Sequence, residues 1–371
     1  MFVALREIRR SPVRFGLLAA AIGLLLFLVL FQQALQHGLV TSFVGAIRNQ
    51  SATVLVYSIE GQRTLEGSVI PPPLEEAVLA VDGIAEHGPI GQRTFTVTVN
   101  GGEPDDASVI GTDGPLGRPA ELSAGRLPEA PFEAIGSAVD FEVGDTVTLA
   151  AARADVQPLT VVGLADDVQL SVSPTLFTDF DTYAAAVVAV NPDADAVLPS
   201  ALALVPADGT SPGDLAADIN ATVQDADAVT REVAADTAPG VAQVNQSFAV
   251  IFALYSIVVP LVTGLFFLIV TLQKAPSLVL LRAIGARAGT LARSLVFQAL
   301  VVAAAGIAFG VALFLLLSGR EVGSLTIRFD PVNVGVWVGL FLLLALVGTF
   351  ASLRRVLRID PLRATGIGTT P

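Results

Sequence analysis

The chain has no cysteine and is poor in several other residue types that carry chemistry. Its 371 residues include one lysine, two histidines, one methionine and one tryptophan. Without cysteine, a disulfide framework, a thiol nucleophile and a cysteine-based zinc site are all excluded. The single lysine, Lys274, lies in no glycine loop, so a Gly-x-x-x-x-Gly-Lys-Ser/Thr phosphate-binding loop is excluded. The chain is therefore not expected to hydrolyse ATP by itself.

The two histidines, His37 and His87, are fifty residues apart. This spacing excludes a His-x-x-x-His metal site, and a Ser-His-Asp triad would have to use one of these two side chains. Adjacent acids occur at 75–76, 105–106 and 166–167. Neighbouring residues of a strand point to opposite faces, so these pairs indicate a solvated surface rather than a catalytic dyad.

Charged residues are missing from four long stretches, 15–47, 237–273, 294–319 and 331–353. Each stretch contains the roughly 20 apolar residues that a helix needs to cross a bilayer core of about 30 Å. An acidic segment of about two hundred residues separates the first stretch from the other three. The sequence therefore predicts a membrane protein with four transmembrane α-helices in a 1+3 arrangement and a large α+β extracytoplasmic domain between helices 1 and 2.

The segment boundaries follow from these stretches. The first apolar region is longer than that of a signal peptide and no clear small-x-small cleavage site follows it, so we interpret it as a retained helix. The predicted segments are a cytoplasmic N-terminal segment 1–14, a first span 15–37, the extracytoplasmic domain with stalk ends 38–247, a second span 248–272, a cytoplasmic coupling loop 273–294, a third span 295–318, an outer loop 319–330, a fourth span 331–353 and a cytoplasmic tail 354–371.

Charge predicts the orientation of these spans, because basic residues beside transmembrane helices stay on the cytoplasmic side. Twelve of the 21 basic residues lie in the segments 1–14, 273–294 and 354–371, where the only acids are Glu7 and Asp360. The rest of the chain has 9 basic and 32 acidic residues. Both termini are therefore expected in the cytoplasm and the acidic domain outside, at the cell membrane. Such an acidic surface argues against nucleic acid as a partner.

The extracytoplasmic segment shows the same β-α-β order twice. Periodicity and helix-start signals predict strand, helix and strand at 52–58, 73–81 and 93–100, and again at 201–206, 211–222 and 228–232, with Ser211 or Thr210 as the second helix cap. Two such halves are typical of one ferredoxin-like layer. Residues 107–190 predict an inserted β-rich subdomain without a convincing helix, and residues 38–49 and 234–247 are expected to extend the first two spans as a stalk.

Glycines four residues apart occur in the third and fourth spans, at Gly306 and Gly310 and at Gly335 and Gly339. This spacing lets helix backbones approach closely in lipid. Packing within one chain is favoured here over a dedicated dimer motif.

A short run in the loop between the second and third spans indicates a family. It reads Ser277-Leu-Val-Leu-Leu-Arg-Ala-Ile-Gly-Ala-Arg287, and its Leu-Arg-Ala-Ile-Gly-Ala part resembles the signature of the MacB/FtsX-like permeases of ABC transporters. The segment from Leu357 to Ala364 resembles the tail that follows the fourth helix in that family. The runs 4–9, 56–60 and 65–70 look most like the HrtB/DevC branch, whose HrtB-type members export haem.

The resemblance implies partners and a division of labour. It implies a non-catalytic permease in which two copies pair in the membrane lipid, each bound to a cytoplasmic ABC ATPase subunit. The loop would carry the movement of the ATPase to the spans, and helices 1 and 2 would transmit it mechanically to the outer domain. The coupling residues that the motif implies are Ser277, Leu280, Leu281, Arg282, Ile284, Gly285 and Arg287.

If haem is the substrate, its site is expected where helices 1 and 2 leave the outer leaflet. No resident cofactor and no metal site are predicted, and haem enters only as cargo. Iron in haem takes histidine, tyrosine or carboxylate ligands in proteins. The candidates are His37, Tyr57, Glu60, Glu66 and Tyr255. For each of them an ordinary role stays open, as an interfacial histidine, an exposed acid or a packing aromatic residue.

Other functions also stay open. Related permeases extract lipids, lipoproteins or amphiphilic peptides from the outer leaflet, and the FtsX branch regulates a cell-wall hydrolase through its outer domain. A compact outer domain of about a hundred residues would favour the regulator. The larger segment seen here, with its apparent insertion, favours transport.

Overall fold

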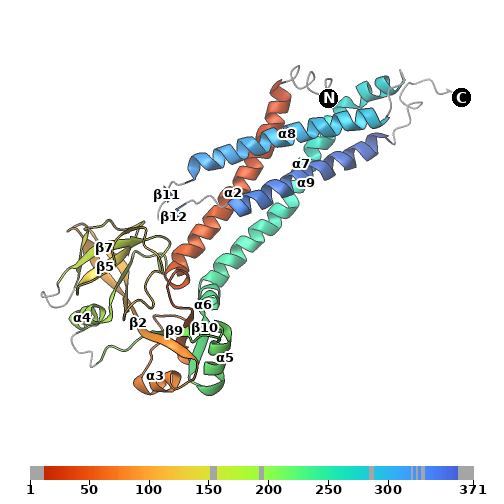
Figure 1. The fold of residues 1–371 in the computed structure, drawn as a ribbon. Helices are drawn as coiled ribbons and strands as arrows, with labels where there is room; N and C mark the ends of the chain where they lie inside the picture. Colours follow the sequence, from red (N-terminus) through yellow and green to blue (C-terminus); the bar gives the residue numbers. More distant parts are fainter. Residues whose placement is uncertain are drawn as a thin grey trace. The chain divides into compact units, whose positions relative to one another are not determined.

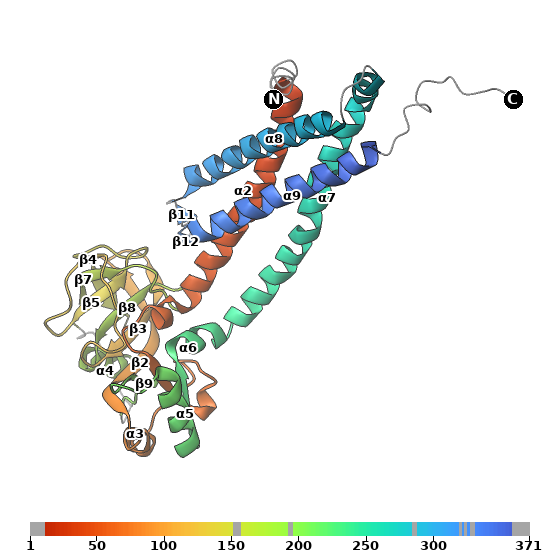
Figure 2. The same cartoon turned by 45° about the vertical axis from the view of Figure 1, so that its right-hand side comes forward.

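A computed structural model describes residues 12–150, 157–191, 196–283, 288–318, 321–322, 325–326 and 331–357. The chain divides into two compact units (Figures 1 and 2). The sheet unit contains residues His37–Gln246. The helical unit contains the first part of helix α2 (Pro12–Arg48), most of helix α7 (Val241–Ala283), and helices α8 (Ala288–Leu317) and α9 (Pro331–Leu357). Two short strands, β11 (Glu321–Val322) and β12 (Leu325–Thr326), pair with each other.

Three helices among the described residues are long and apolar enough to cross a membrane. Their apolar segments are Phe15–Arg48, Val241–Leu265 and Val296–Leu317. The fourth predicted span does form a helix, α9, but the apolar segment of its described part, Val334–Leu344, is shorter than a span requires. The count of four spanning helices is therefore not confirmed by the described residues.

Helices α2 and α8 cross at a contact between glycine backbones. A Cβ atom on Gly23 would lie 2.6 Å from the carbonyl oxygen of Gly306, and one on Gly310 would lie 2.5 Å from that of Gly23. The prediction that Gly306 and Gly310 pack within the chain is confirmed, with Gly23 as the partner that the sequence did not single out. Among the described residues nothing lies within 4 Å of a Cβ built on Gly335 or Gly339, so the same prediction is not confirmed for that pair.

The two β-α-β halves form one antiparallel layer, as predicted. Its strands are β1 (Val54–Ser58), β2 (Ile84–Val99), β9 (Ala201–Pro206) and β10 (Ala226–Thr230), in the spatial order β10-β1-β9-β2. Helices α3 (Pro72–Leu79) and α5 (Pro212–Thr222) make the two connections. The Ser211 hydroxyl accepts a hydrogen bond from the Asp214 N–H at 3.1 Å and so caps α5. This strand order and connectivity are those of a ferredoxin-like fold.

Alternating side chains bury both faces of this layer. Val54, Val56, Leu202 and Leu204 point to the face covered by α3 and α5, where Leu74, Val78, Leu215 and Ile219 pack on them. Leu55, Tyr57, Ala201 and Ala203 point to the opposite face, which the end of α2, helix α6 (Arg231–Thr237) and the start of α7 cover. Period-two alternation on a strand places successive side chains on opposite faces, so both cores follow from the same few residues.

Strand β2 is longer than the predicted strand 93–100 and begins at Ile84. Residues 84–90 pair with β9 and complete the ferredoxin-like layer, whereas residues 90–99 pair with β3 (Pro104–Thr112) and β6 (Thr146–Leu149). The predicted strand 93–100 is thus the second half of β2. Its first half contains Gly88 and Pro89 and lacks clear alternation, so no strand was predicted there.

The inserted segment is rich in β-structure but belongs to the same sheet. Beyond β3 the order continues through β8 (Thr175–Asp179), β5 (Glu133–Ser137), β7 (Leu159–Ala165) and β4 (Ala124–Gly125). The absence of a helix from 107–190 was a wrong prediction, because α4 (Phe180–Val190) lies there. The Asp179 carboxylate accepts from the Thr182 N–H at 2.7 Å and begins this helix.

The two segments predicted as a stalk continue the apolar helices over residues 38–48 and 241–247, and residues 234–240 do not. Helix α2 continues to Arg48, with a non-helical residue at Val44 (φ −133°, ψ 15°). This break frees the carbonyls of Ser42 and Phe43, which accept hydrogen bonds at 2.9 Å from the N–H groups of Val172 and Ser171. On the other side α7 begins only at Val241, since Pro239 and Gly240 (φ +91°) separate it from α6.

Helix α4 is seated on two facing glycines. Gly91 and Gly111 are partners in the β2–β3 register, and the Tyr183 ring lies against both. A Cβ atom on Gly111 would lie 2.3 Å from the Cβ of Tyr183, and one on Gly91 would lie 2.2 Å from the ring. Burial of the Tyr183 ring therefore requires glycine at both positions.

We expect the substitution Gly111→Ala to lower the free energy of unfolding of the sheet unit by about 1–3 kcal/mol, because the added methyl group overpacks a filled core. Gly213→Ala is the matched control, since a Cβ at Gly213 has only an ordinary contact at 3.9 Å and alanine favours helix α5. Chemical denaturation of both variants measures the difference. Equal stabilities for the two variants would contradict this account of Tyr183.

Candidate functional site

The candidate ligands Glu60 and Glu66 lie in the loop of residues 59–68 after β1, which hydrogen bonds hold in place and which we call the tied loop. The chain makes a single 3-10 turn at η1 (Ile59–Gly61), and Gln62 and Arg63 then adopt left-handed conformations (φ 50° and 59°). The Ser58 N–H donates to the Ser68 hydroxyl at 2.9 Å and closes the neck of the loop. A Cβ on Gly61 would lie 2.4 Å from the Cβ of Ser68, so glycine is required at this crossing.

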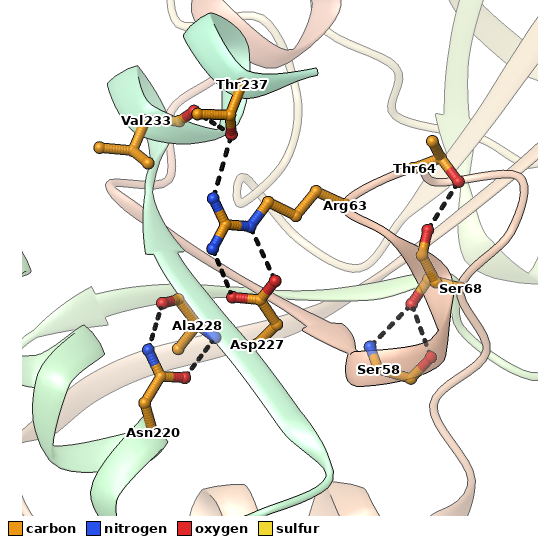
Figure 3. Close-up of polar contacts among 10 residues, drawn as sticks. Ser58, Arg63, Thr64, Ser68, Asn220, Asp227, Ala228, Val233 and Thr237 are labelled. Carbon is orange, nitrogen blue, oxygen red and sulfur yellow. Dashed lines mark hydrogen bonds and ion pairs between the residues drawn. The ribbon is translucent and has the colours of Figure 1, made fainter. Parts of the chain in front are cut away.

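An ion pair holds the middle of this loop to the edge strand (Figure 3). The Arg63 guanidinium donates to both carboxylate oxygens of Asp227, with Nε to Oδ2 at 2.7 Å and Nη2 to Oδ1 at 3.0 Å. It also donates to the Thr237 hydroxyl of α6 at 3.3 Å. The hydrogen bond to Asp227 raises the pKa of Arg63, and the two-pronged geometry is the strong form of such a pair. Arg63 thereby connects the loop to β10 and α6.

The outer edge of the sheet beside this pair is closed by a side chain. Asn220 of α5 donates to the Ala228 carbonyl at 2.8 Å and accepts from the Ala228 N–H at 2.7 Å (Figure 3). Strand β10 is at the end of the sheet order, so these backbone groups have no neighbouring strand. Pairing with a side-chain amide hides them from strands of other molecules.

Glu60 and Glu66 are both exposed, and they lie on opposite sides of Arg63 in sequence. Glu66 accepts a weak hydrogen bond from the Thr94 hydroxyl at 3.3 Å. Glu60 lies on η1 at the wall of a surface pocket. Both carboxylates are thus presented to solvent by a loop whose backbone is held at its neck and at Arg63.

Tyr57 is the candidate that the structure makes least accessible. Its side chain is 0% exposed, and its hydroxyl is buried without a hydrogen-bond partner among the described residues. Burial raises the pKa of Tyr57, and the nearby Asp227 carboxylate raises it further. Tyrosine binds haem iron as the phenolate, so a buried tyrosine kept protonated does not suit this role. In this conformation Tyr57 is a core residue.

His37 and Tyr255 fall into different units. His37 is exposed on α2 in the sheet unit. Tyr255 is half-buried on α7 in the helical unit, where its ring meets the edge of Phe252 with centroids 6.4 Å apart. Phe252 stacks on Trp337 of α9 at 6.1 Å, and the Trp337 indole donates a hydrogen bond to Gln33 of α2. Tyr255 is therefore part of an aromatic cluster that joins α7 to α9.

Four of the predicted coupling residues, Ser277, Leu280, Leu281 and Arg282, lie in the last two turns of α7, which is helical to Ala283. The short helix predicted in the coupling loop is thus a continuation of α7. Ile284, Gly285 and Arg287 lie outside the described residues.

Sequence reasoning did not find Arg63, Asp227 or Trp337. Arg63 and Asp227 are 164 positions apart, and nothing local in either segment predicts the pairing. The only usable signal would have been the predicted neighbourhood of β1 and β10 in a ferredoxin-like layer, which places the start of the loop beside β10.

This arrangement, a ferredoxin-like layer with an inserted β-region between long apolar helices, defines a membrane protein with a large domain outside the spans. Residues 16–222 match the family model of the MacB-like periplasmic core domain, and residues 248–361 match that of the FtsX-like permease C-terminal region. The chain therefore belongs to the MacB/FtsX-like family of ABC transporter permeases, which are generally non-catalytic subunits.

Individual relatives agree with this family. A candidate hemin transport system permease, HrtB, of Staphylococcus haemolyticus is 23% identical over 99% of both chains. Its counterpart in Staphylococcus epidermidis strain RP62A is 31% identical, with the match spanning 32% of this chain and 33% of that protein. An uncharacterised ABC transporter permease of Mycobacterium tuberculosis is 25% identical over 99% of both chains. The periplasmic region of MacB from Actinobacillus actinomycetemcomitans is 12% identical, with a TM-score of 0.35 over 53% of this chain and 96% of that one.

The substitution Tyr57→Phe is expected to raise the free energy of unfolding at neutral pH by about 1 kcal/mol, since it removes a buried hydroxyl without a partner. It is also expected to flatten the pH dependence at high pH. Above about pH 10 the unfolded chain releases the Tyr57 proton that the folded chain retains. The free energy of unfolding of the native protein therefore falls as the pH rises, and that of Tyr57→Phe lacks this contribution. Denaturation at pH 7 and pH 11 measures both effects. A loss of stability in Tyr57→Phe at pH 7 would show that the hydroxyl has a partner.

Proposed function

We propose that this chain is the membrane subunit of an ABC-type efflux transporter that exports haem and is driven by a separate cytoplasmic ATPase. The match to the two family models over 16–222 and 248–361 is the observation that carries the permease role. The relatives named as candidate hemin permeases support haem as the substrate class. These 371 residues contain no phosphate-binding loop, which supports a partner that supplies the ATPase.

Mechanical transmission suits the two helices that connect the units. Helices α2 and α7 contain 37 and 43 residues, well beyond the roughly 20 that a bilayer core requires. Their extra length lies partly in the sheet unit, where the end of α2 and the start of α7 lie on the same face of the ferredoxin-like layer. The end of α2 is hydrogen-bonded to the loop of residues 169–172, and α6, just before α7, packs on the ferredoxin-like layer. Movement of α2 would therefore act on the inserted β-region as well as on the face that it shares with α6 and α7.

Four spanning helices complete this proposal, with α9 as the fourth. Both termini then lie on the cytoplasmic side, with the sheet unit outside, as the basic flanking segments indicate. Two copies of the chain, each with one ATPase subunit, make the working transporter. The coupling contacts come from the end of α7 and the residues that follow it, Ser277 to Arg287.

Haem binding is assigned to Glu66, with His37 and Tyr255 as further candidates. Glu66 is exposed on a tied loop, carries only a weak hydrogen bond, and offers a carboxylate that can bind ferric iron. Glu60 shares the loop. Tyr57 is withdrawn as a direct ligand in this conformation because it is fully buried.

Haemin titration of the permease purified with its ATPase tests the substrate. We expect a saturable shift of the Soret band together with altered ATP turnover, weakened at least tenfold in Glu66→Ala, His37→Ala or Tyr255→Phe because an iron ligand is lost. Tyr57→Phe and Glu76→Ala are the matched controls, a buried tyrosine and an exposed acid on α3, and both should bind as the native chain does.

The opposite outcome is also informative. A Soret shift no larger than that of detergent blanks would reject haem. Export of lipid, lipoprotein or amphiphilic peptide, or FtsX-like regulation of a cell-wall hydrolase, would then take its place.

Orientation and the number of spans can be measured directly because the chain has no cysteine. We expect a membrane-impermeant maleimide to label Glu76→Cys in intact cells, and to label Ser277→Cys and Thr369→Cys only after the membrane is opened. Labelling of Thr369→Cys in intact cells, with Ser277→Cys still protected, would show that three helices span the membrane rather than four. Labelling of Ser277→Cys in intact cells would reverse the proposed orientation.

A further inference from the structure

A surface pocket of about 490 Å³ opens on the sheet unit at the end of β1. Its walls are η1, the segment before α3, the first turns of α3 and the turn between α5 and β10. The volume is in the range of about 300–1,000 Å³ that small-molecule sites occupy. None of the interactions assigned above to haem or to the ATPase requires this pocket, although Glu60 contributes to its wall.

The pocket exposes apolar side chains that a folded surface normally hides. Ile59 and Val69 are 57% and 51% exposed, and both line it. Pro71, Leu74 and Val223 add further apolar surface. Covering such surface is favourable by about 25 cal/mol for each Å² removed from water, so an apolar body gains free energy by entering.

The charged groups of the same walls are acidic. Glu60 and Asp225 both line the pocket, and none of the described lysine, arginine or histidine residues does. The nearby cation, Arg63, is engaged by Asp227 at 2.7 and 3.0 Å. Two carboxylates without a cation in the lining repel an anion and attract a positive charge.

The walls are held in place before any ligand arrives. The Ile59 N–H donates to the Asp225 carbonyl at 2.9 Å and joins the Glu60 side to the Asp225 side. The neck bond from Ser58 to Ser68 fixes the loop that supplies Val69, and Pro71 and Pro73 restrict the backbone of the third wall. A pocket of this kind loses little conformational entropy on binding.

We propose that this pocket binds a small amphiphilic organic cation, with its apolar body against Ile59, Val69 and Leu74 and its positive charge beside Glu60 and Asp225. This site is separate from haem export and does not rest on it. A neutral apolar ligand would leave the two carboxylates partly desolvated without compensation, and an anionic one would be repelled. Only a cation satisfies the apolar and the acidic walls together.

The test uses the full-length permease in lipid nanodiscs with a single cysteine, Ala77→Cys, that carries an environment-sensitive dye at the pocket. Ala80→Cys, an exposed position at the C-cap of α3 that does not line the pocket, is the control for the dye. Hexylammonium and hexanoate are the matched probes, since they share the apolar chain and differ in charge. Empty nanodiscs correct for partition into lipid.

We expect hexylammonium to shift the emission saturably at position 77 and not at position 80, and hexanoate to leave both unchanged. Glu60→Gln with Asp225→Asn should weaken hexylammonium at least tenfold, whereas the charge-matched pair Glu76→Gln with Glu86→Gln should not. Saturation-transfer NMR on the unlabelled chain repeats the titration without a dye in the pocket. Equal responses to the two probes, or no saturable response by either method, would overturn the proposal.

Discussion

Strand β1 buries both of its faces, and the architecture of the sheet unit depends on this. Val54 and Val56 pack under α3 and α5, while Leu55 and Tyr57 pack under the end of α2 and α6. Each such side chain contributes on the order of 1.5–3 kcal/mol when fully removed from water. A strand with two apolar faces must lie inside a sheet and between layers of helices, which β9, β10 and the flanking helices provide. The helices that carry the apolar spans therefore meet the sheet on one defined face.

The break in α2 at Val44 allows the end of this helix to form backbone hydrogen bonds with the loop of residues 169–172. Interrupting a helix leaves carbonyl groups without partners, and here the N–H groups of Ser171 and Val172 satisfy two of them. The same loop accepts a hydrogen bond from the Ala46 N–H at 3.0 Å through the Gln169 carbonyl. One long helix is thus bonded to the inserted β-region, while the partner helix α7 begins beside the ferredoxin-like layer. Helix α2 therefore contacts both parts of the sheet, through hydrogen bonds to the inserted β-region and through packing on the ferredoxin-like layer.

Electrostatics at the candidate site follow from a single pair. Arg63 and Asp227 neutralise each other and hold the loop that presents the exposed carboxylates of Glu60 and Glu66. The two carboxylates of the loop therefore differ in their surroundings and in the ligands proposed for them. A carboxylate that reaches out to solvent suits an iron ligand on Glu66, and an acidic pocket with apolar walls on the Glu60 side suits an organic cation.

The sequence alone determined the apolar spans, the β-α-β repeats, the family motif and the exclusion of thiol and nucleotide-loop chemistry, because these depend on composition and on local periodicity. It also predicted strand β9 at its observed bounds and α5 with Ser211 or Thr210 as its cap, of which the structure shows Ser211. Tertiary structure decided the rest. Nothing in the sequence around Tyr57 distinguishes it from an exposed strand tyrosine, and it is the packing of α2 and α6 that buries it. Tyr183 of α4 packs against Gly91 and Gly111, which are distant from it in sequence. Segments more than 150 residues apart meet in the ion pair of Arg63 with Asp227 and in the acidic pocket. Local propensity depends on neighbouring residues and does not predict such contacts.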